Sequence, residues 1–305
     1  MPRMSAALRW EVLKPEHLGA YTNLLDGAFS LAAPASYLSD FPFWNPGITD
    51  HAANRFQIGG WLDDRLVSSA SLRLADYRSI SLKIIKMGFV GAVCTHPDFS
   101  GKGFAGEALD LILEEGITQG VSVFALWGSE SSLYEKRKFV SGGKQIRLPI
   151  SEMNFKRFGS IENSGIEILA GWNDEILHLL ADRDFGIVYQ ETDLAWLRRQ
   201  QSSAYRTAWR GEKCVGFIAW NRGIDLTNLI HECEGEETAK RALLCSAQFE
   251  NPALEWLTSE QTLKKISSNV PDLKFEYLAQ FRVRDGTKIT EEEMNRLWFS
   301  GFDSC

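Results

Sequence analysis

The chain has 305 residues, 44% hydrophobic and 24% charged, a composition typical of a globular protein long enough for two domains. A formal net charge of −7 argues against nucleic acid as a general partner, because phosphate backbones bind basic faces. No apolar run approaches the ~18 residues of a membrane span and no signal peptide is evident, so we expect a cytoplasmic protein without membrane contact. The five cysteines lack CxxC spacing, which argues against disulfides and a metal site.

Residues 14–30 carry apolar side chains at the spacing of one helical face, with Pro15 near the start, and predict a helix. Residues 32–51 are rich in proline, aromatic and small polar side chains and predict a short helix within a long loop. Aromatic residues in such loops often line ligand sites, although covering the core is an equal alternative. The candidates for an acceptor pocket wall are Phe41, Phe43 and Trp44.

The next elements predict a mixed α/β unit. Two strand-like runs meet at Asp63 and Asp64, as in a hairpin, and a third strand leads into a glycine-rich loop followed by an amphipathic helix. A continuous apolar run then predicts a buried strand. The expected ranges are 55–62, 65–74 and 86–95 for the strands, 104–115 for the helix, 121–127 for the buried strand, 131–138 for a short helix and 144–150 for a closing strand.

The glycine-rich loop places Gly101, Gly103 and Gly106 at a helix N-terminus, where unpaired N–H groups and the helix dipole favour a phosphate or pyrophosphate. The loop formally matches G-x-G-x-x-G, but residues 96–100 separate it from the strand and no series of βα units follows, unlike a Rossmann unit. Lys102 lies between two glycines, so the loop is not a P-loop. A turn with a purely structural role remains the alternative.

Two segments resemble the GCN5-related N-acetyltransferase (GNAT) superfamily. Residues 95–105, THPDFSGKGFA, are similar to its motif A, (Arg/Gln)-x-x-Gly-x-(Gly/Ala), with Ser100, Gly103 and Ala105 on the motif positions and Ser100 replacing Arg or Gln. Residues 133–139, LYEKRKF, resemble its Tyr-x-x-x-Gly-Phe ending, with Lys138 replacing glycine. Two motifs in the right order, one helix and one strand apart, are more specific than either alone.

The resemblance implies that strands 86–95 and 121–127 splay apart around the pantetheine arm of acetyl-coenzyme A, the co-substrate, with no metal. It implies Tyr134 as the general acid for the departing thiolate. A general base is not evident; His51, His96, Asp40 and Glu130 lie near loops. The implied contacts with coenzyme A are Val93, Cys94, Thr95, Ser100, Gly101, Lys102, Gly103, Phe104, Ala105 and Gly106.

The activity implied by the resemblance is direct acetyl transfer from the thioester to an amine, on a small molecule or a protein. An acidic chain would attract a cationic acceptor. One alternative is transfer of a longer acyl group. Another is a catalytically weak acyl-coenzyme A-binding regulatory protein. The sequence leaves the acceptor and the oligomeric state open.

The second half repeats the order hairpin, strand, helix, strand at residues 204–220, 226–230, 236–249 and 253–258, which indicates a diverged second copy. Its counterpart of the glycine-rich loop, residues 231–237, has one glycine and four carboxylates that would repel a pyrophosphate. We therefore expect only the first copy to bind coenzyme A. The expected domains are a catalytic GNAT-like domain at 1–158, a linker at 159–165 and a degenerate GNAT-like domain with a helical tail at 166–305.

An active copy followed by a degenerate one resembles the "enhanced intracellular survival" type of bacterial acetyltransferase. Proteins of that type generally continue into a sterol-carrier-like domain, whose C-terminal carboxylate is catalytic. Here one more helical segment, 291–298, follows residue 285, so we expect that domain to be absent or vestigial. The predicted fold class is α/β, with mixed sheets in tandem GNAT-like domains.

Overall fold

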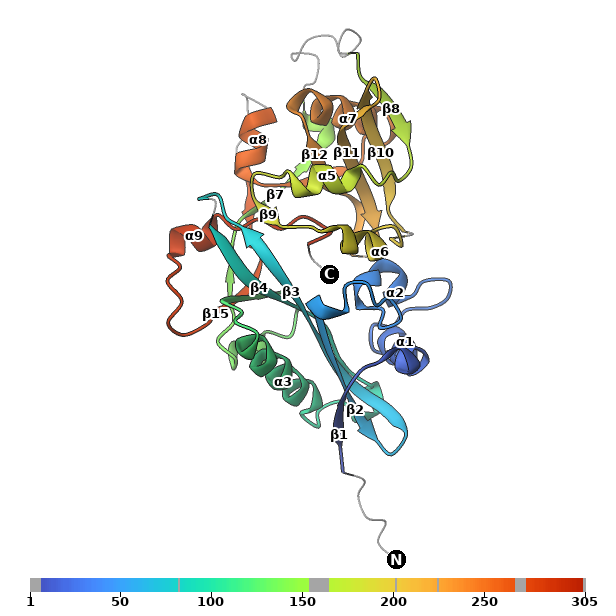
Figure 1. The fold of residues 1–305 in the computed structure, drawn as a ribbon, viewed down its shortest axis with the longest axis vertical. Helices are drawn as coiled ribbons and strands as arrows, with labels where there is room; N and C mark the ends of the chain where they lie inside the picture. The colour runs from blue at the N-terminus through green and yellow to red at the C-terminus, as the bar shows by residue number, and fades with distance from the viewer. Residues whose placement is uncertain are drawn as a thin grey trace, which may run out of the picture.

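The computed structural model describes residues 7–81, 83–153, 165–200, 202–223, 225–266 and 273–303. These residues form two mixed sheets that follow one another along the long axis of the molecule, with the C-terminus between them (Figure 1). Helices pack on both sheets. The α-helices are α1 (Leu18–Ala28), α2 (Tyr37–Asp40), α3 (Phe104–Thr118), α4 (Ser131–Glu135), α5 (Ile176–Ala181), α6 (Leu194–Leu197), α7 (Glu237–Glu250), α8 (Glu260–Ile266) and α9 (Glu291–Asn295).

The first sheet has the strand order β1-β2-β3-β4-β5-β15-β6, and β9 pairs with β3. Only β4 and β5 are parallel, because α3 forms the crossover between them. The predicted hairpin, feeding strand and helix are confirmed, with β3 and α3 each longer than expected. The strands are β1 (Arg9–Val12), β2 (Arg55–Leu62), β3 (Arg65–Arg78), β4 (Ile84–Thr95), β5 (Val123–Leu126), β6 (Val140–Gly142), β9 (Gly186–Ile187) and β15 (Ala279–Val283).

Period-two alternation along β4 and β5 divides the core of the first sheet into two faces. Phe89 and Ala125 point to the face that α1 covers, whereas Val90 and Phe124 pack with the apolar side of α3. On the α1 face, Phe43 and Trp44 of the short 3₁₀ helix Pro42–Trp44 are fully buried, so these two predicted pocket residues belong to the core. Phe41 instead lines a cavity.

The second sheet has the order β14-β7-β13-β12-β11-β10-β8. Its antiparallel strands β10, β11 and β12 are followed by α7 and by β13, which is parallel to β12. This repeats the path β2, β3, β4, α3, β5 and confirms the predicted tandem fold class. The strands are β7 (Gln145–Pro149), β8 (Glu167–Ala170), β10 (Ala204–Arg210), β11 (Lys213–Arg222), β12 (Leu226–Gly235), β13 (Glu255–Thr258) and β14 (Phe275–Glu276).

The two sheets exchange strands. The strand predicted at 144–150 exists as β7, but its placement in the first half is wrong, because Leu148 pairs with Trp256 of β13. In return, β15 enters the first sheet between β5 and β6, where Phe281 pairs with Ala125 and Val140. Most of the predicted linker, residues 159–164, lies outside the described residues, and the domain boundaries remain a prediction.

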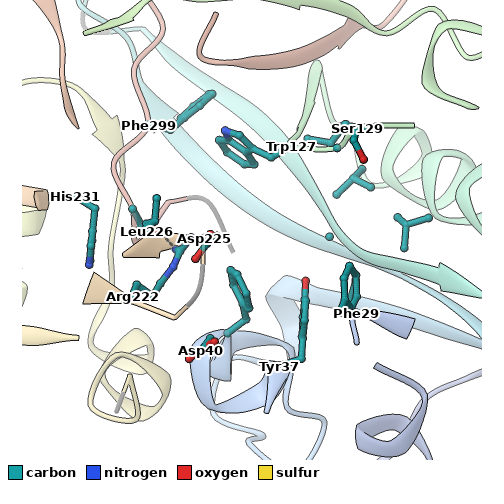
Figure 2. A pocket seen from close by; sticks show the side chains of 18 of the residues that line it. Phe29, Tyr37, Asp40, Trp127, Ser129, Arg222, Asp225, Leu226, His231 and Phe299 are labelled. Carbon is teal, nitrogen blue, oxygen red and sulfur yellow. Dashed lines mark hydrogen bonds and ion pairs between the residues drawn. The ribbon is translucent and has the colours of Figure 1, made fainter. Parts of the chain in front are cut away.

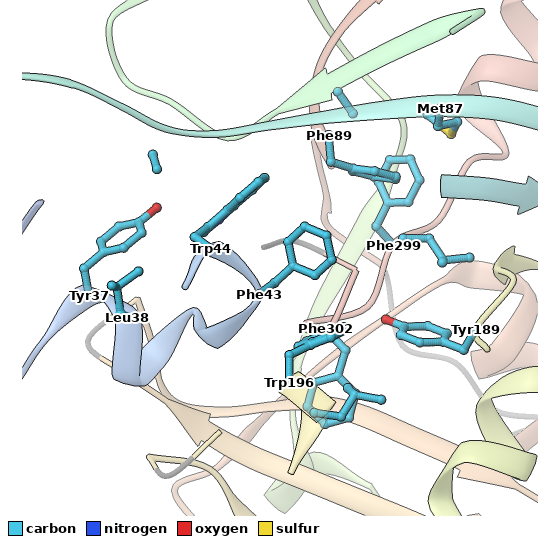
Figure 3. Close-up of a cluster of buried hydrophobic side chains, with 14 of the residues drawn as sticks. Tyr37, Leu38, Phe43, Trp44, Met87, Phe89, Tyr189, Trp196, Phe299 and Phe302 are labelled. Atoms are coloured by element: carbon cyan, nitrogen blue, oxygen red, sulfur yellow. The ribbon is translucent and has the colours of Figure 1, made fainter. Parts of the chain in front are cut away.

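Residues 297–303, here called the C-terminal segment, lie between the sheets and share one buried cluster with both (Figure 3). In it, Phe299 and Phe302 pack near Phe43 and Phe89 of the first half and Trp196 of the second. The helix predicted at 291–298 forms only as far as Asn295, since the chain then extends into this cluster.

Polar groups from both sheets fix the backbone of the C-terminal segment. From β3, Arg73 donates to Phe302 O at 3.1 Å, and Tyr77 Oη bonds both the N–H and the carbonyl of Trp298. From the second half, Arg183 forms a buried ion pair with Asp303 at 3.0 Å. Glu232 of β12 accepts the N–H of Phe302 at 2.6 Å.

The strand exchange predicts that β15 is needed for the stability of the first sheet. Truncating the buried Phe281 to alanine should lower the free energy of unfolding by about 3–5 kcal/mol, the usual cost of emptying a phenylalanine site in a core. Urea denaturation measures the change. Tyr277→Ala is the matched control, since this neighbouring side chain is 72% exposed and should cost less than about 0.5 kcal/mol. Equal stability of both variants would contradict the role of β15.

A second prediction concerns pH. Burial, against the opposing charge of Arg183 and aided by Asp303, raises the pKa of Glu232 from 4.5 to about 8. The folded protein thus holds a proton that the unfolded chain has lost, so stability should fall as pH rises from 4.5 to about 8. Glu232→Gln keeps an acceptor oxygen for Phe302 and should flatten this fall, so its stability relative to wild type should rise with pH. Urea denaturation at each pH measures the two stabilities. If the urea midpoints of wild type and Glu232→Gln change by the same amount between pH 4.5 and about 8, the prediction is contradicted.

Candidate active site

A cleft opens where β4 and β5 separate. The two strands pair over residues 87–90 and 123–126 only, and β5 ends there while β4 continues along β3 as far as Thr95. A β-bulge at Ala92, where φ is 51°, lies just beyond the last residue of β4 that pairs with β5. The splay implied by the family resemblance is therefore present in the structure.

The backbone of β4 beyond the bulge presents alternate residues to the cleft. Serine hydroxyls of β3 donate to the carbonyls of Ala92 and Cys94, so the polar groups of these two residues face β3. By alternation, the backbone groups of Val93 and Thr95 face the cleft. Cys94 is turned toward β3, and burial raises the pKa of its thiol to about 11, so it supplies no thiolate.

The glycine-rich loop leaves its backbone open. Gly101 and Gly103 have φ of 76° and 86°, and a Cβ atom on either would meet nothing within 4 Å. Gly103 precedes the first turn of α3, in which Phe104 and Ala105 have N–H groups without intrahelical acceptors. Ser100 and Lys102 are exposed on the same loop. These groups fit an anion at the positive end of α3.

Gly106 has a different use in the structure. Its N–H donates to Gly103 O at 2.9 Å, and a Cβ atom would lie 2.9 Å from the guanidinium of Arg137. Arg137 donates to Gly106 O and forms a bidentate pair with Asp110, at 2.6 and 2.7 Å. This glycine therefore lets the segment after α4 pack on α3, and its predicted contact with coenzyme A stays a prediction.

Tyr134 lies on α4 at the far side of the cleft, with its ring directly against Gly128. Burial, followed by the charge of Glu130, raises the pKa of the phenol above its ordinary value of 10.0. Tyr134 is thus protonated at neutral pH, and among the described residues no group forms a hydrogen bond with its Oη. The next motif position, Lys138, has φ 62°, which explains why the family prefers glycine there.

The cleft continues into a cavity of about 740 Å³ lined by both halves of the chain. Figure 2 shows Phe29 and Tyr37 on one side, Trp127 and Phe299 on the opposite side, and Arg222 with His231 toward the second sheet. Sequence reasoning identified the β4 and α4 residues and Phe41, but not the second-sheet and C-terminal residues, because no local motif signals them. Those additional residues are Gln145, Arg147, Arg222, Asp225, Leu226, His231, Leu257, Trp298, Phe299, Ser300 and Gly301.

The four candidate bases divide into two groups. Asp40 and Glu130 line the cavity, and burial raises the pKa of Asp40, whose carboxylate accepts from Ser202. His51 is buried against Phe43 O and burial lowers its pKa to about 4, while His96 contacts Arg65 in the loop. Both histidines therefore have structural contacts outside the cavity.

The second copy lacks an equivalent loop. Gly235 ends β12, and α7 begins at Glu237, so only the N-cap residue Glu236 lies between strand and helix. A Cβ atom on Gly235 would lie 2.2 Å from Val215 O, which shows how tightly this junction packs. Glu236 pairs with Arg210 at 2.7 Å. The difference in the loop is confirmed, and the absence of coenzyme A binding there remains a prediction.

The described part of the chain contains no group of three or more His, Cys, Asp or Glu side chains arranged to hold a metal ion. None of its helices has the length and apolarity needed to cross a membrane.

Residues 11–140 match the family model of the acetyltransferase (GNAT) domain. This part of the chain is a GNAT domain, and the predicted membership is confirmed. The protein is thus an acyltransferase of the kind that takes its acyl group from an acyl-coenzyme A. Comparison with curated proteins gives no match.

Solved structures share the fold. A probable N-acyltransferase from Enterococcus faecalis V583 has a TM-score of 0.65 at 14% identity, covering 91% of this chain and 73% of that chain. A GCN5-related N-acetyltransferase from Anabaena variabilis gives 0.65 at 12% identity with the same coverage. Eis1 from Mycobacterium abscessus gives 0.61 at 11% identity, covering 91% and 74%. The likeness spans both sheets and is one of fold.

The open loop yields a prediction about binding. Gly103→Glu should weaken coenzyme A binding at least about 100-fold, because it places bulk and negative charge at the anion-favouring end of α3. Gly120→Glu is the matched control: it lies just beyond the other end of α3, with φ 83° and open space around it, so the backbone strain is equal. Calorimetry should show one coenzyme A per chain for wild type and for the control. Unimpaired binding by the Gly103 variant, or two sites per chain, would contradict the assignment.

Proposed function

We propose that this acyltransferase moves an acetyl group from acetyl-coenzyme A directly to an amine in the cytoplasm. The observation that carries the proposal is that one cavity joins the cleft of β4 and β5, the phenol of Tyr134 and a large acceptor side. Direct transfer needs the thioester and the acceptor in the same enclosed space. The buried Cys94 thiol is unsuited to accept the acetyl group covalently, which also favours direct transfer.

Each part of the site has a separate task. The cleft-facing backbone groups of Val93 and Thr95 would hold the pantetheine arm, and the open N-terminus of α3 would bind the pyrophosphate. When bound, acetyl-coenzyme A supplies the activated acetyl group. The amine nitrogen forms the new bond to the acetyl carbon while the bond from that carbon to sulfur breaks.

Tyr134 would give its phenolic proton to the departing sulfur. Its raised pKa keeps that proton in place at neutral pH, so the phenol can donate it to the sulfur as negative charge develops there. The attacking amine must lose a proton, and Glu130 is a carboxylate that lines the same cavity. We propose Glu130 or a water molecule beside it as the acceptor of that proton.

Substitution of Tyr134 tests the proposal. Tyr134→Phe keeps the ring against Gly128 but removes the proton donor, so kcat should fall roughly ten- to a thousandfold while affinity for acetyl-coenzyme A stays nearly unchanged. Steady-state kinetics with the best acceptor from an amine panel, together with calorimetry, separates the two quantities. Tyr277→Phe, at an exposed tyrosine outside the cavity, is the control. A kcat within about twofold of wild type would remove Tyr134 from the catalytic residues.

A further inference from the structure

We propose that the acceptor is a primary amine carried on an aromatic, flat body, which the cavity holds between two aromatic walls. This inference rests on the proposed acetyl transfer to an amine and names the class of that amine. Its basis is the arrangement of rings on the acceptor side, where Phe29 and Tyr37 face Trp127 and Phe299 across the cavity (Figure 2).

The first wall is a stack of planar groups. The rings of Phe29 and Tyr37 lie 4.6 Å apart and 21° from parallel, and those of Tyr37 and Phe41 lie 4.6 Å apart and 29° from parallel. The guanidinium of Arg222 continues the stack 4.7 Å from the Phe41 ring. Each ring braces the next, so this wall is rigid before any acceptor arrives.

The second wall is the indole of Trp127. Its Nε1 donates to Leu278 O at 2.8 Å, which fixes the orientation of the ring. The Phe89 ring is stacked with the indole, with ring centroids 6.3 Å apart and planes 8° from parallel. The Phe299 ring meets the indole edge-on, with centroids 5.9 Å apart. Trp127 is therefore held from behind by buried rings, and a face remains open to the cavity.

The outermost ring of each wall stays exposed inside a concave site. Phe29 is 39% and Trp127 38% exposed, although other aromatic residues of the same cavity, such as Phe299, are buried. Burying apolar area stabilises a complex, and stacked or edge-on aromatic pairs add stabilisation beyond the area buried. A flat body between these two rings would gain both terms, and rigid walls lose little entropy on binding.

The charges of the cavity favour an aromatic primary amine over a polycationic acceptor. Asp225 is paired with Arg222 at 2.8 Å, and Arg147 with Glu255 at 3.7 Å. The buried carboxylate of Asp40 accepts from Ser202 at 2.8 Å. Of the three carboxylates that line the cavity among the described residues, Asp40 and Asp225 thus have partners within the chain, and Glu130 alone offers at most one site for an ammonium group, so a row of ammonium groups gains little there.

The experiment measures thiol release from acetyl-coenzyme A with the full chain and three amines, tryptamine, hexylamine and spermidine, with mass analysis of the acetylated product. Wild type should show kcat/KM for tryptamine at least about tenfold above the other two. Phe29→Ala should raise KM for tryptamine about tenfold, leave KM for acetyl-coenzyme A unchanged, and be rescued by Phe29→Tyr. Phe249→Ala is the control, since this phenylalanine of α7 is 93% exposed and lies outside the cavity.

The outcomes distinguish this inference from the function on which it rests. Turnover that favours hexylamine or spermidine, or an unchanged KM for tryptamine in a Phe29→Ala variant with wild-type melting temperature, overturns the aromatic acceptor and leaves acetyl transfer standing. Coenzyme A binding without thiol release for any amine, protein amines included, overturns both.

Discussion

The rest of the structure depends on the buried ion pair between Arg183 and Asp303. It fixes the C-terminal segment between the two sheets, and Trp298, Phe299, Ser300 and Gly301 of this segment line the cavity. Taking both charges out of water is costly, but removing one partner leaves an uncompensated buried charge, which typically costs 3–5 kcal/mol. The pair is therefore better understood as a device that specifies one docking position than as a net source of stability. In that position the segment contributes four residues to the lining of the cavity.

Local patterns in the sequence predicted local structure well. The hairpin of β2 and β3 and the path β4, α3, β5 follow from apolar periodicity, and the motif residues Gly103 and Tyr134 lie where that path places them. Strand partners were not predictable in the same way. The strand at 144–150 was predicted but not its partner, and the strand at 279–283 was not predicted; nothing in the alternation of either segment specifies that it pairs in the other sheet. Such pairings depend on the shape of the whole core, which a short window of sequence does not contain.

In the candidate site, too, the sequence predicted the residues of local motifs but not the residues that only long-range contacts bring together. The motif predicted Val93 and Thr95, and the structure adds a reason, since the alternation of β4 turns their backbone toward the cleft while Cys94 faces β3. Phe29 was expected only as part of a helical face, and Trp127 only as the end of a strand. Both become candidate acceptor contacts because segments about 100 residues apart meet across one cavity, a proximity that the sequence alone does not reveal.

The two copies of the fold differ most at the junction between a strand and the helix that follows it. This difference is consistent with different roles for the two copies. In the first copy, eight residues between β4 and α3 leave the helix N-terminus open, whereas in the second only Glu236 lies between β12 and α7, and Gly235 packs on Val215. The carboxylates of Glu236 and Glu237 already lie at the positive end of the α7 dipole. An external anion would therefore gain little binding energy there. The second sheet instead contributes Arg222 and Leu226 to the cavity. The degenerate copy thereby completes the cavity that the first copy opens.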